Sequence, residues 1–391
     1  MPDEQRFSRA VVVVLDSLGI GELPDAAAFG DPGAATLQHI AQAVPGLALP
    51  CLEKMGLGRI APIAGVGAVA TPTGFCGRMA ELSVGKDTTT GHWELAGLVV
   101  REPFSLFPHG FPPEIVDPFV EQTGRGILGN KTASGIQILD ELGEEHLRTG
   151  QWILYTSADS VFQLAAHEQK ISLAELYAAC QKARALLDRY RVGRVIARPF
   201  VGPPGKFERT YNRHDFSFLP DGPTVLGALV QQGIEVTGVG KISDIFSGQG
   251  ITRSLPTRGN QDGMAQTEGL IDQGVEGLIF INLVDFDMNF GHRRDPQGYA
   301  RALEAFDRWL PRLLTRLGPG ELLIICADHG CDPTYLAHTD HTREYVPVLM
   351  FSPRWTIGGD LGVRQSFADV AATLAEALGA PWAGPGTSLL P

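Results

Sequence analysis

The amino-acid sequence predicts an α/β protein whose mostly parallel β-sheet is flanked by helices and which carries a smaller α/β domain as an insertion. A buried-type strand lies near the start of the chain, and beyond residue 222 such strands alternate with helical segments, which is typical of a parallel sheet. The middle of the chain is instead bounded by two segments rich in proline. The length of 391 residues also favours two domains.

The strands and helices of the sheet domain can be placed in order along the chain. Residues 9–16 form a β-branched run that ends in an aspartate, which is typical of a buried parallel strand. Similar runs predict further strands at 234–240, 277–287, 321–330 and 346–352. Helical patterns occupy 223–233, 295–318 and 367–379. The helix at 295–318 has a proline near its start and ends at a glycine, as helices commonly do.

The insertion is predicted to span residues 103–221. A Pro- and Phe-rich linker is expected at 101–119, and a second break at 218–224. Between them, strand-like segments at 152–160 and 192–199 enclose a helical pattern at 172–191. The remaining residues, 1–102 and 222–391, are then expected to form one catalytic core.

Composition excludes several classes of function. Lys and Arg number 32 against 44 Asp and Glu, and the resulting net charge of −12 makes general binding to nucleic acid or anionic membrane unfavourable. The longest aliphatic run, 11–15, is far shorter than the ~18 residues of a membrane helix. The five cysteines form no CxxC pair, which fits a reducing compartment. We therefore expect a cytoplasmic protein with no nucleic-acid, membrane or obligate protein partner.

Acidic residues recur where the most hydrophobic strands end, and histidines follow them. The acidic residues are Asp16, Asp285, Asp287 and Asp328, and the histidines are His292, His329, His338 and His341. Carboxyl ends of parallel strands meet at one edge of a sheet, where clustered carboxylates repel one another unless a cation lies among them. Carboxylate and imidazole ligands suit Mn²⁺, Zn²⁺, Fe²⁺ or Mg²⁺, and this many of them favours two cations.

A simpler explanation exists for each of these residues taken alone. A single aspartate at a strand end more often caps a helix or forms a turn, and a lone histidine is more often a satisfied core or surface residue. The combination favours a metal site. Asp285, His338 and Asp340 are the expected bystanders.

A threonine run lies in SVGKDTTTGHWELAG, residues 83–97. A hydroxyl close to a helix N-terminus lies where backbone N–H groups favour anionic oxygen. Beside a divalent cation it could ionise and act as a nucleophile, whereas a threonine run alone would more often only cap the helix. The segment is not a P-loop, because Ala80 replaces the first glycine and Asp87 follows the lysine.

A basic segment spans residues 182–213, with nine Lys and Arg against two acidic residues. Its helical members are expected to form a solvated face. Arg194 and Arg198 would share one face of a strand, and Arg209 follows in a Gly/Pro-rich segment. Arginine binds phosphate through two parallel hydrogen bonds, so a phosphate site is predicted here.

These motifs together resemble those of the bacterial-type phosphopentomutases of the alkaline phosphatase superfamily. The most specific matches are GKDTTTGHWE, VGRVIARPFVG, RTYNRHDFS, NLVDFDMNFGHRRDPQGY, ADHGCDPT and TDHTREYVPVL. Matching stretches run in family order from residue 11 to about residue 350. The resemblance implies an alkaline-phosphatase-like core with an inserted substrate-binding cap.

The resemblance also implies roles for individual residues. One metal would be bound by Asp16, Asp328 and His329, and the other by Asp287, His292 and His341. Thr88 would be the phosphorylated nucleophile. The residues at substrate-binding positions are Ser157, Asp159, Val161, Arg194, Ile196, Arg209 and Lys241. The cofactors would be two Mn²⁺ ions, with ribose 1,5-bisphosphate or glucose 1,6-bisphosphate as activator.

The implied reaction interconverts α-D-ribose 1-phosphate and D-ribose 5-phosphate, or their 2-deoxyribose analogues, in nucleoside catabolism and salvage. Phospho-Thr88 and a bisphosphate would be its intermediates. Two departures from the family pattern concern the metal site. Cys331 stands where asparagine is common, and an extra residue before His341 brings His338 near the site.

Three other functions remain as alternatives. A phosphatase or phosphodiesterase would use the same metals but would need no basic cap. A cofactor-independent phosphoglycerate mutase typically has a serine nucleophile, which GKDT does not match. A metal-stabilised binding protein would have no need for Thr88 beside a full ligand set.

Overall fold

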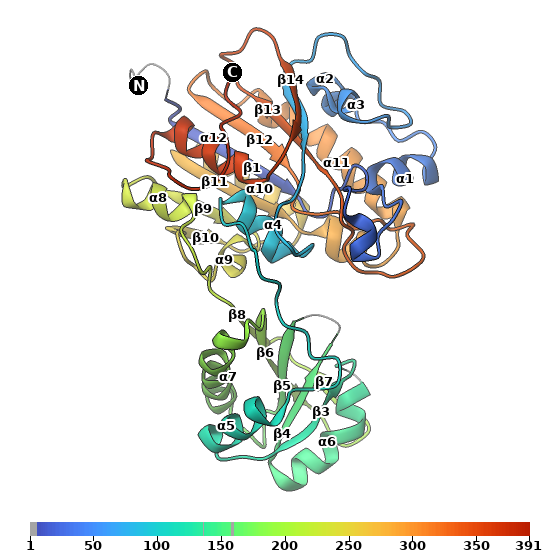
Figure 1. Cartoon of the computed structure of the whole chain (residues 1–391), viewed down its shortest axis with the longest axis vertical. Helices are drawn as coiled ribbons and strands as arrows, with labels where there is room; N and C mark the ends of the chain where they lie inside the picture. The colour runs from blue at the N-terminus through green and yellow to red at the C-terminus, as the bar shows by residue number, and fades with distance from the viewer. Residues whose placement is uncertain (1–5, 136, 158–159) are drawn as a thin grey trace. The chain divides into compact units, whose positions relative to one another are not determined.

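The structure is a computed structural model that describes residues 6–135, 137–157 and 160–391. The chain forms two compact units (Figure 1): Met1–Arg101 joined with Pro220–Pro391, and Glu102–Leu219. The second unit differs from the expected insertion, 103–221, by one residue at its start and two at its end. We call the first the core unit and the second the inserted unit.

The core unit contains an eight-stranded mixed sheet. Its strands, in spatial order, are β10 (Arg253–Leu255), β9 (Val236–Val239), β11 (Gly277–Leu283), β1 (Arg9–Leu15), β12 (Glu321–Cys326), β13 (Val346–Phe351), β2 (Phe75–Met79) and β14 (Gly359–Arg364). The strands from β10 to β12 are parallel, and β13 runs antiparallel to both of its neighbours. This confirms the predicted α/β class with a mostly parallel sheet.

Helices cover both faces of this sheet. Every residue of β1 and β11 is therefore buried, whichever face its side chain occupies. They are α1 (Thr36–Ala43), α2 (Pro50–Met55), α3 (Leu57–Ile60), α4 (Thr88–Leu95), α8 (Val225–Gln231), α9 (Ile242–Ile245), α10 (Asn260–Asp272), α11 (Pro296–Leu314) and α12 (Ala368–Leu378). In one group α11 packs against α1 and α2, and in another α12 packs against α4 and α8. A short 3₁₀ helix, η2 (Ala26–Phe29), follows the first loop.

The inserted unit contains a second, six-stranded sheet. Its strands are β3 (Ile127–Thr132), β4 (Trp152–Thr156), β5 (Val161–His167), β6 (Arg194–Val201), β7 (Glu208–Arg209) and β8 (His214–Ser217). Its helices are α5 (Pro113–Thr123), α6 (Gln137–Thr149), α7 (Leu173–Leu187) and the short η3 (Asp188–Tyr190). Trp152, Phe162 and Phe119 are fully buried in its main apolar cluster.

Two local predictions were wrong. The expected linker at 101–119 overlaps α5, which begins at Pro113 and buries Ile115 and Phe119 against the inserted sheet's core. The strand expected at 277–287 ends at Leu283 and is followed by a π-helix, η4 (Phe286–Gly291). Hydrophobic patterning does not reveal a π-helix, whose widened turn often occurs at functional sites. Within the described ranges, no helix is both long and apolar enough to span a membrane.

Candidate active site

Three buried aspartates meet where β1, β11 and β12 end. The three strands lie side by side and parallel, so their carboxyl ends share one edge. Asp16 directly follows β1, and Asp328 follows β12 after one residue. Asp287 lies in η4, the π-helix that follows β11. The strand order therefore brings together aspartates that are far apart in the sequence.

Histidines complete two groups of potential metal ligands at this edge. One group contains Asp287, His292 and His341, and the other contains Asp16, Asp287 and His329. The ligand atoms of each group lie within 4.8 Å of one another, and Asp287 belongs to both groups. The remaining predicted ligand, Asp328, places its Oδ2 3.2 Å from His329 Nε2. We call the six predicted ligands together the acidic centre.

Several ligand atoms of the acidic centre have no hydrogen-bond partner among the described residues. These buried atoms are Asp16 Oδ1 and the pair Asp287 Oδ1 and His341 Nε2, which face each other at 3.5 Å. Asp328 Oδ2 instead lies 3.0 Å from His92 Nδ1 and 3.2 Å from His329 Nε2. Native proteins rarely leave buried polar atoms unpaired. Carboxylate and imidazole donors of this kind fit divalent cations such as Mn²⁺, Zn²⁺ or Fe²⁺. The residues present therefore fit a divalent metal site.

The electrostatics of the acidic centre lead to the same conclusion. Burial raises the pKa of Asp16 well above its ordinary value, and the nearby carboxylates of Asp328 and Asp287 raise it further. Burial would also raise the pKa of Asp287, but the surrounding histidines, His341 first among them, hold it below its usual value. A bound cation would relieve the repulsion among the carboxylates.

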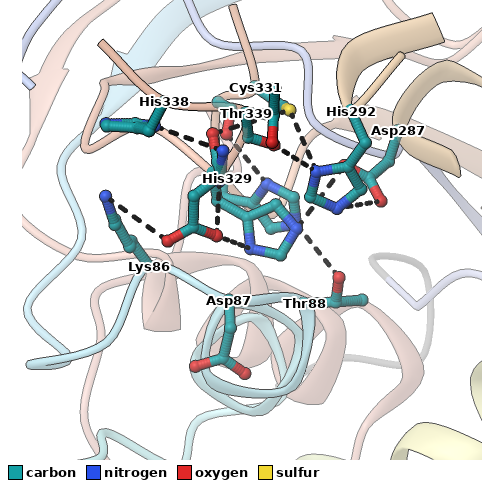
Figure 2. A network of polar contacts seen from close by, with 12 residues as sticks. Lys86, Asp87, Thr88, Asp287, His292, His329, Cys331, His338 and Thr339 are labelled. Carbon is teal, nitrogen blue, oxygen red and sulfur yellow. Dashed lines mark hydrogen bonds and ion pairs between the residues drawn. The ribbon is translucent and has the colours of Figure 1, made fainter. Parts of the chain in front are cut away.

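Thr88 is the first residue of α4, so the helix begins at the threonine run rather than after it. The N-cap is Asp87, whose side chain accepts hydrogen bonds from the backbone N–H groups of Thr89 and Thr90. Thr88 is thus free of the capping role, and its Oγ1 lies 3.1 Å from His329 Nε2 (Figure 2). The hydroxyl of Thr88 therefore lies at a helix N-terminus and at the acidic centre.

Two buried residues behind the acidic centre were missed by the sequence analysis. His92 lies one helical turn after Thr88, and its Nδ1 donates to the Thr88 carbonyl oxygen at 2.9 Å. Its Nε2 can then accept from Asn282 Nδ2 at 3.2 Å, and the same amide nitrogen donates to Asp16 Oδ2 at 2.9 Å. This chain links the helix of Thr88 to Asp16, one of the predicted metal ligands. The sequence could have pointed to His92, because it lies in the GHWE motif directly after the threonine run. No sequence motif pointed to Asn282.

The expected bystanders have other partners. Asp285 Oδ2 accepts the backbone N–H of Asn260 at 2.7 Å. His338 Nε2 lies 2.7 Å from Asp31 Oδ1, and His338 is in neither ligand group. Asp340 is in neither group and accepts the N–H of His341. Cys331 Sγ lies 3.8 Å from His292 Nδ1, and burial raises the pKa of its thiol well above the ordinary value.

The predicted substrate residues are divided between the two units. In the core unit, Lys241 follows β9. Its positive charge offsets a small part of the rise in the pKa of Asp16 that burial causes. In the inserted unit, Val161 on β5 lies opposite Arg194 on β6. Ile196 lies two residues further along β6 and so on the same face as Arg194.

The other substrate positions lie near the ends of the inserted strands. Ser157 directly follows β4, and Arg209 ends the short strand β7. Asp159 lies outside the described residues. Arg209 Nη1 and the Tyr155 hydroxyl each lie 3.0 Å from the point where a Cβ on Gly135 would stand, so both side-chain ends lie close to the backbone of Gly135.

Comparison with known proteins places the chain in a family. The Metalloenzyme superfamily matches residues 8–381. A phosphopentomutase of Anaeromyxobacter dehalogenans (strain 2CP-C) is 59% identical over 372 residues, which cover 95% of each chain. One of Caldanaerobacter subterraneus subsp. tengcongensis is 55% identical over 385 residues, which cover 98% of each chain.

A solved structure from Pyrococcus horikoshii shares the fold, with a TM-score of 0.50 and 13% identity over 97% of this chain and all of that one. The sequence relatives match the chain over nearly its full length, including the segments that form the acidic centre and the inserted unit. The chain therefore belongs to the phosphopentomutase family of the Metalloenzyme superfamily.

Proposed function

We propose that the protein interconverts α-D-ribose 1-phosphate and D-ribose 5-phosphate, and their 2-deoxyribose counterparts, as an intramolecular phosphotransferase. The observation that carries this proposal is the hydroxyl of Thr88, which begins a helix and lies 3.1 Å from His329 in a centre of unpaired metal-ligand atoms. The relatives named phosphopentomutase, at 55–59% identity, support the choice of substrate.

The acidic centre would hold two divalent cations, which we propose to be Mn²⁺. Asp16, Asp328 and His329 would bind one of them, and Asp287, His292 and His341 the other. When bound, the cations would neutralise charge on the phosphoryl oxygens and favour ionisation of the Thr88 hydroxyl. The mixed carboxylate and imidazole set, which contains no thiolate ligand, supports Mn²⁺.

Phospho-Thr88 would transfer its phosphoryl group to the C1 hydroxyl of ribose 5-phosphate, or to the C5 hydroxyl of ribose 1-phosphate. The bond from phosphorus to Thr88 Oγ1 breaks as the bond to the sugar oxygen forms, and the proton of the sugar hydroxyl balances the charge left on Oγ1. The N-terminus of α4 stabilises that charge. The bisphosphate then turns round and returns its other phosphoryl group to Thr88. Ribose 1,5-bisphosphate or glucose 1,6-bisphosphate would phosphorylate Thr88 initially.

The inserted unit would act as a cap that holds the phosphate that is not reacting. Arg198, Arg209 and Arg213 all lie close enough to the buried Tyr155 for their charges to lower its pKa, although burial raises that pKa overall. Asp215 pairs with Arg213, with Nη2 and Oδ2 2.6 Å apart, and so neutralises part of this charge. Arg198 is partly buried, whereas Arg209 and Arg213 are exposed. Neighbouring arginines favour an anionic ligand, and their planar donors match a phosphate.

Replacing Arg209 with alanine is expected to lower kcat/KM for ribose 5-phosphate by about 10- to 150-fold, the usual cost of losing a charge-assisted hydrogen bond to phosphate. Release of free phosphate should rise as a fraction of turnover, because a poorly held bisphosphate escapes to water. Arg194→Ala should behave similarly. Arg148→Ala is the matched control, since Arg148 is an exposed arginine of α6 that pairs with Glu145. Unchanged kinetics in both cap variants would contradict the proposed grip.

The experiment that tests the function follows ribose 5-phosphate by ³¹P NMR in the presence of Mn²⁺ and a trace of glucose 1,6-bisphosphate. Growth of the ribose 1-phosphate signal, with little inorganic phosphate, is the expected result. Inorganic phosphate as the main product would instead establish a phosphatase. If ribose 5-phosphate stays unchanged while 3-phosphoglycerate is isomerised, the substrate class is wrong.

A further inference from the structure

Asp31 is a fully buried aspartate that receives hydrogen bonds from two distant segments. It follows η2 in the loop after β1. Its carboxylate oxygens each lie 3.0 Å from Lys86 Nζ. Oδ1 also lies 2.7 Å from His338 Nε2, and Oδ2 accepts the backbone N–H of Arg343 at 2.8 Å. Asp31 thus accepts hydrogen bonds from Lys86, near the start of α4, and from His338 and Arg343, in the segment 338–343.

The histidine of this group donates to Asp31 and is not available as a metal ligand. His338 Nδ1 lies 3.2 Å from the backbone nitrogen of Asp340, which can only donate, so Nδ1 must accept. The proton of the neutral ring is then on Nε2, which faces Asp31. Both ring nitrogens are therefore occupied, and His338 supports Asp31.

The second segment holds the first through Arg343 as well. The Arg343 guanidinium is buried and donates to the carbonyl oxygens of Ser83 at 2.8 Å and Gly85 at 2.7 Å. It also pairs with Glu81, with Nη1 and Oε2 2.8 Å apart. Two side chains thus fix residues 81–86 to the segment 338–343. The Arg343 side chain binds the backbone of residues 83–85, and the Lys86 side chain binds Asp31, which in turn contacts His338 and Arg343.

These contacts bear on the candidate active site, because residues 81–86 lead directly to Thr88 and the segment 338–343 contains His341 of the acidic centre. Lys86 precedes Thr88 by two residues (Figure 2), and in the sequence His341 lies between His338 and Arg343. On the other side of Lys86, the cap formed by Asp87 fixes the start of α4. Asp31 therefore bridges the two segments through Lys86, His338 and the backbone of Arg343, alongside the Arg343 guanidinium and the direct pair of Lys86 Nζ with Asp340 Oδ2 at 3.9 Å.

We propose that Asp31 is a positioning residue for phosphoryl transfer. It holds the segment of Thr88 to the segment of His341 through Lys86, His338 and the Arg343 backbone, so that the nucleophile keeps one spacing from the acidic centre. A displacement of about 1 Å at a reacting group can cost ~100-fold in rate, which makes such a support consequential. This inference rests on the proposed function of Thr88.

The test compares Asp31→Asn, Lys86→Met and Lys86→Arg with the wild type, all loaded with Mn²⁺. Asp31→Asn keeps the shape of the side chain but removes its charge. We expect kcat to fall by about 10- to 100-fold in Asp31→Asn and Lys86→Met, while KM for ribose 5-phosphate stays within about threefold. Lys86→Arg should restore much of kcat because it restores the ion pair. Bound metal per chain should stay at the wild-type level.

The matched control is His39→Gln. His39 Nδ1 lies 2.5 Å from Asp332 Oδ2, a histidine–aspartate contact of the same kind, but it touches neither residues 81–86 nor residues 338–343. Its kcat should match that of the wild type. Wild-type kcat in both Asp31→Asn and Lys86→Met would overturn the inference. So would a loss of metal that accounts for the loss of activity, since Asp31 would then serve the metal site instead.

Hydrogen exchange separates this inference from the proposed function. In Asp31→Asn, peptides covering residues 83–90 and 338–343 should exchange faster than in the wild type, whatever reaction the protein catalyses. If the wild type forms no ribose 1-phosphate but these peptides exchange faster, the function is wrong and the structural coupling stands. If the wild type is a mutase and exchange is unchanged, the inference is wrong. Should Asp31→Asn not fold, the same comparison in Lys86→Met decides.

Discussion

Replacing Thr88 with alanine is expected to abolish the conversion of ribose 5-phosphate, with a loss of about 10³-fold or more. The variant loses the oxygen that accepts and returns the phosphoryl group. It should still fold, because Asp87 and not Thr88 caps α4. The measurement is the initial rate of ribose 1-phosphate formation, together with the far-UV circular dichroism spectrum of the variant.

The threonine run provides the controls for this result. Thr89→Ala should keep its activity, since the backbone N–H of Thr89, not its hydroxyl, binds Asp87. Thr90 is a poorer control because its hydroxyl accepts from the Asp87 N–H at 3.3 Å and belongs to the capping box. Near wild-type turnover in Thr88→Ala, or a loss only in Thr89→Ala, would assign the nucleophile elsewhere.

The substitution Asp287→Asn is expected to cause the second large loss, about 10²- to 10³-fold in kcat/KM, which is typical of removing one strong electrostatic group from a phosphoryl or acyl transfer site. Asp287 is the residue that both candidate ligand groups contain, so its charge would act on both proposed metal positions even though it would bind only one of the cations. Metal content should fall below that of the wild type. Asp285→Asn is the matched control, because Asp285 lies two residues earlier and is in neither group.

The same pair of variants can be compared without any activity assay. Adding Mn²⁺ to chelator-treated wild type should raise Tm, because a ligand that binds only the folded state stabilises it, by about 2.7 kcal/mol at 100 times Kd. Asp285→Asn should show the wild-type rise in Tm, and Asp287→Asn a smaller one. Equal rises in both variants, with two metals per chain in each, would exclude Asp287 from the metal site.

The sequence predicted the parts of the fold that depend on local patterns. The run at 9–15 forms β1, and Asp16 follows it. This strand was predictable because a continuous apolar run is typical of a buried strand. The path of the chain after Leu283 was not predictable in the same way. A strand and a π-helix can follow the same apolar run, and only packing around the acidic centre decides between them.

Contacts between distant residues were also beyond the sequence. Asn282 joins Asp16 to His92 across the sheet edge, and nothing in the local pattern of a buried strand distinguishes its asparagine from any other. Asp31 and Lys86 are 55 residues apart, with three helices and the strand β2 between them, so their contact depends on how these elements pack. The substrate residues of the inserted unit rest on resemblance, because arginine on a strand has many structural uses.

The central claim is that Thr88 carries the phosphoryl group between the two ends of the sugar. The most direct test incubates the wild type with glucose 1,6-bisphosphate, isolates the peptide that contains residue 88 and locates the phosphoryl group by mass spectrometry. Ribose 5-phosphate is then added, and the loss of the group from the peptide is followed. The account predicts one phosphoryl group on Thr88 that passes to the sugar at a rate no slower than turnover. A phosphoryl group on another residue, or a phosphothreonine that the sugar does not discharge while mutase activity continues, would contradict it.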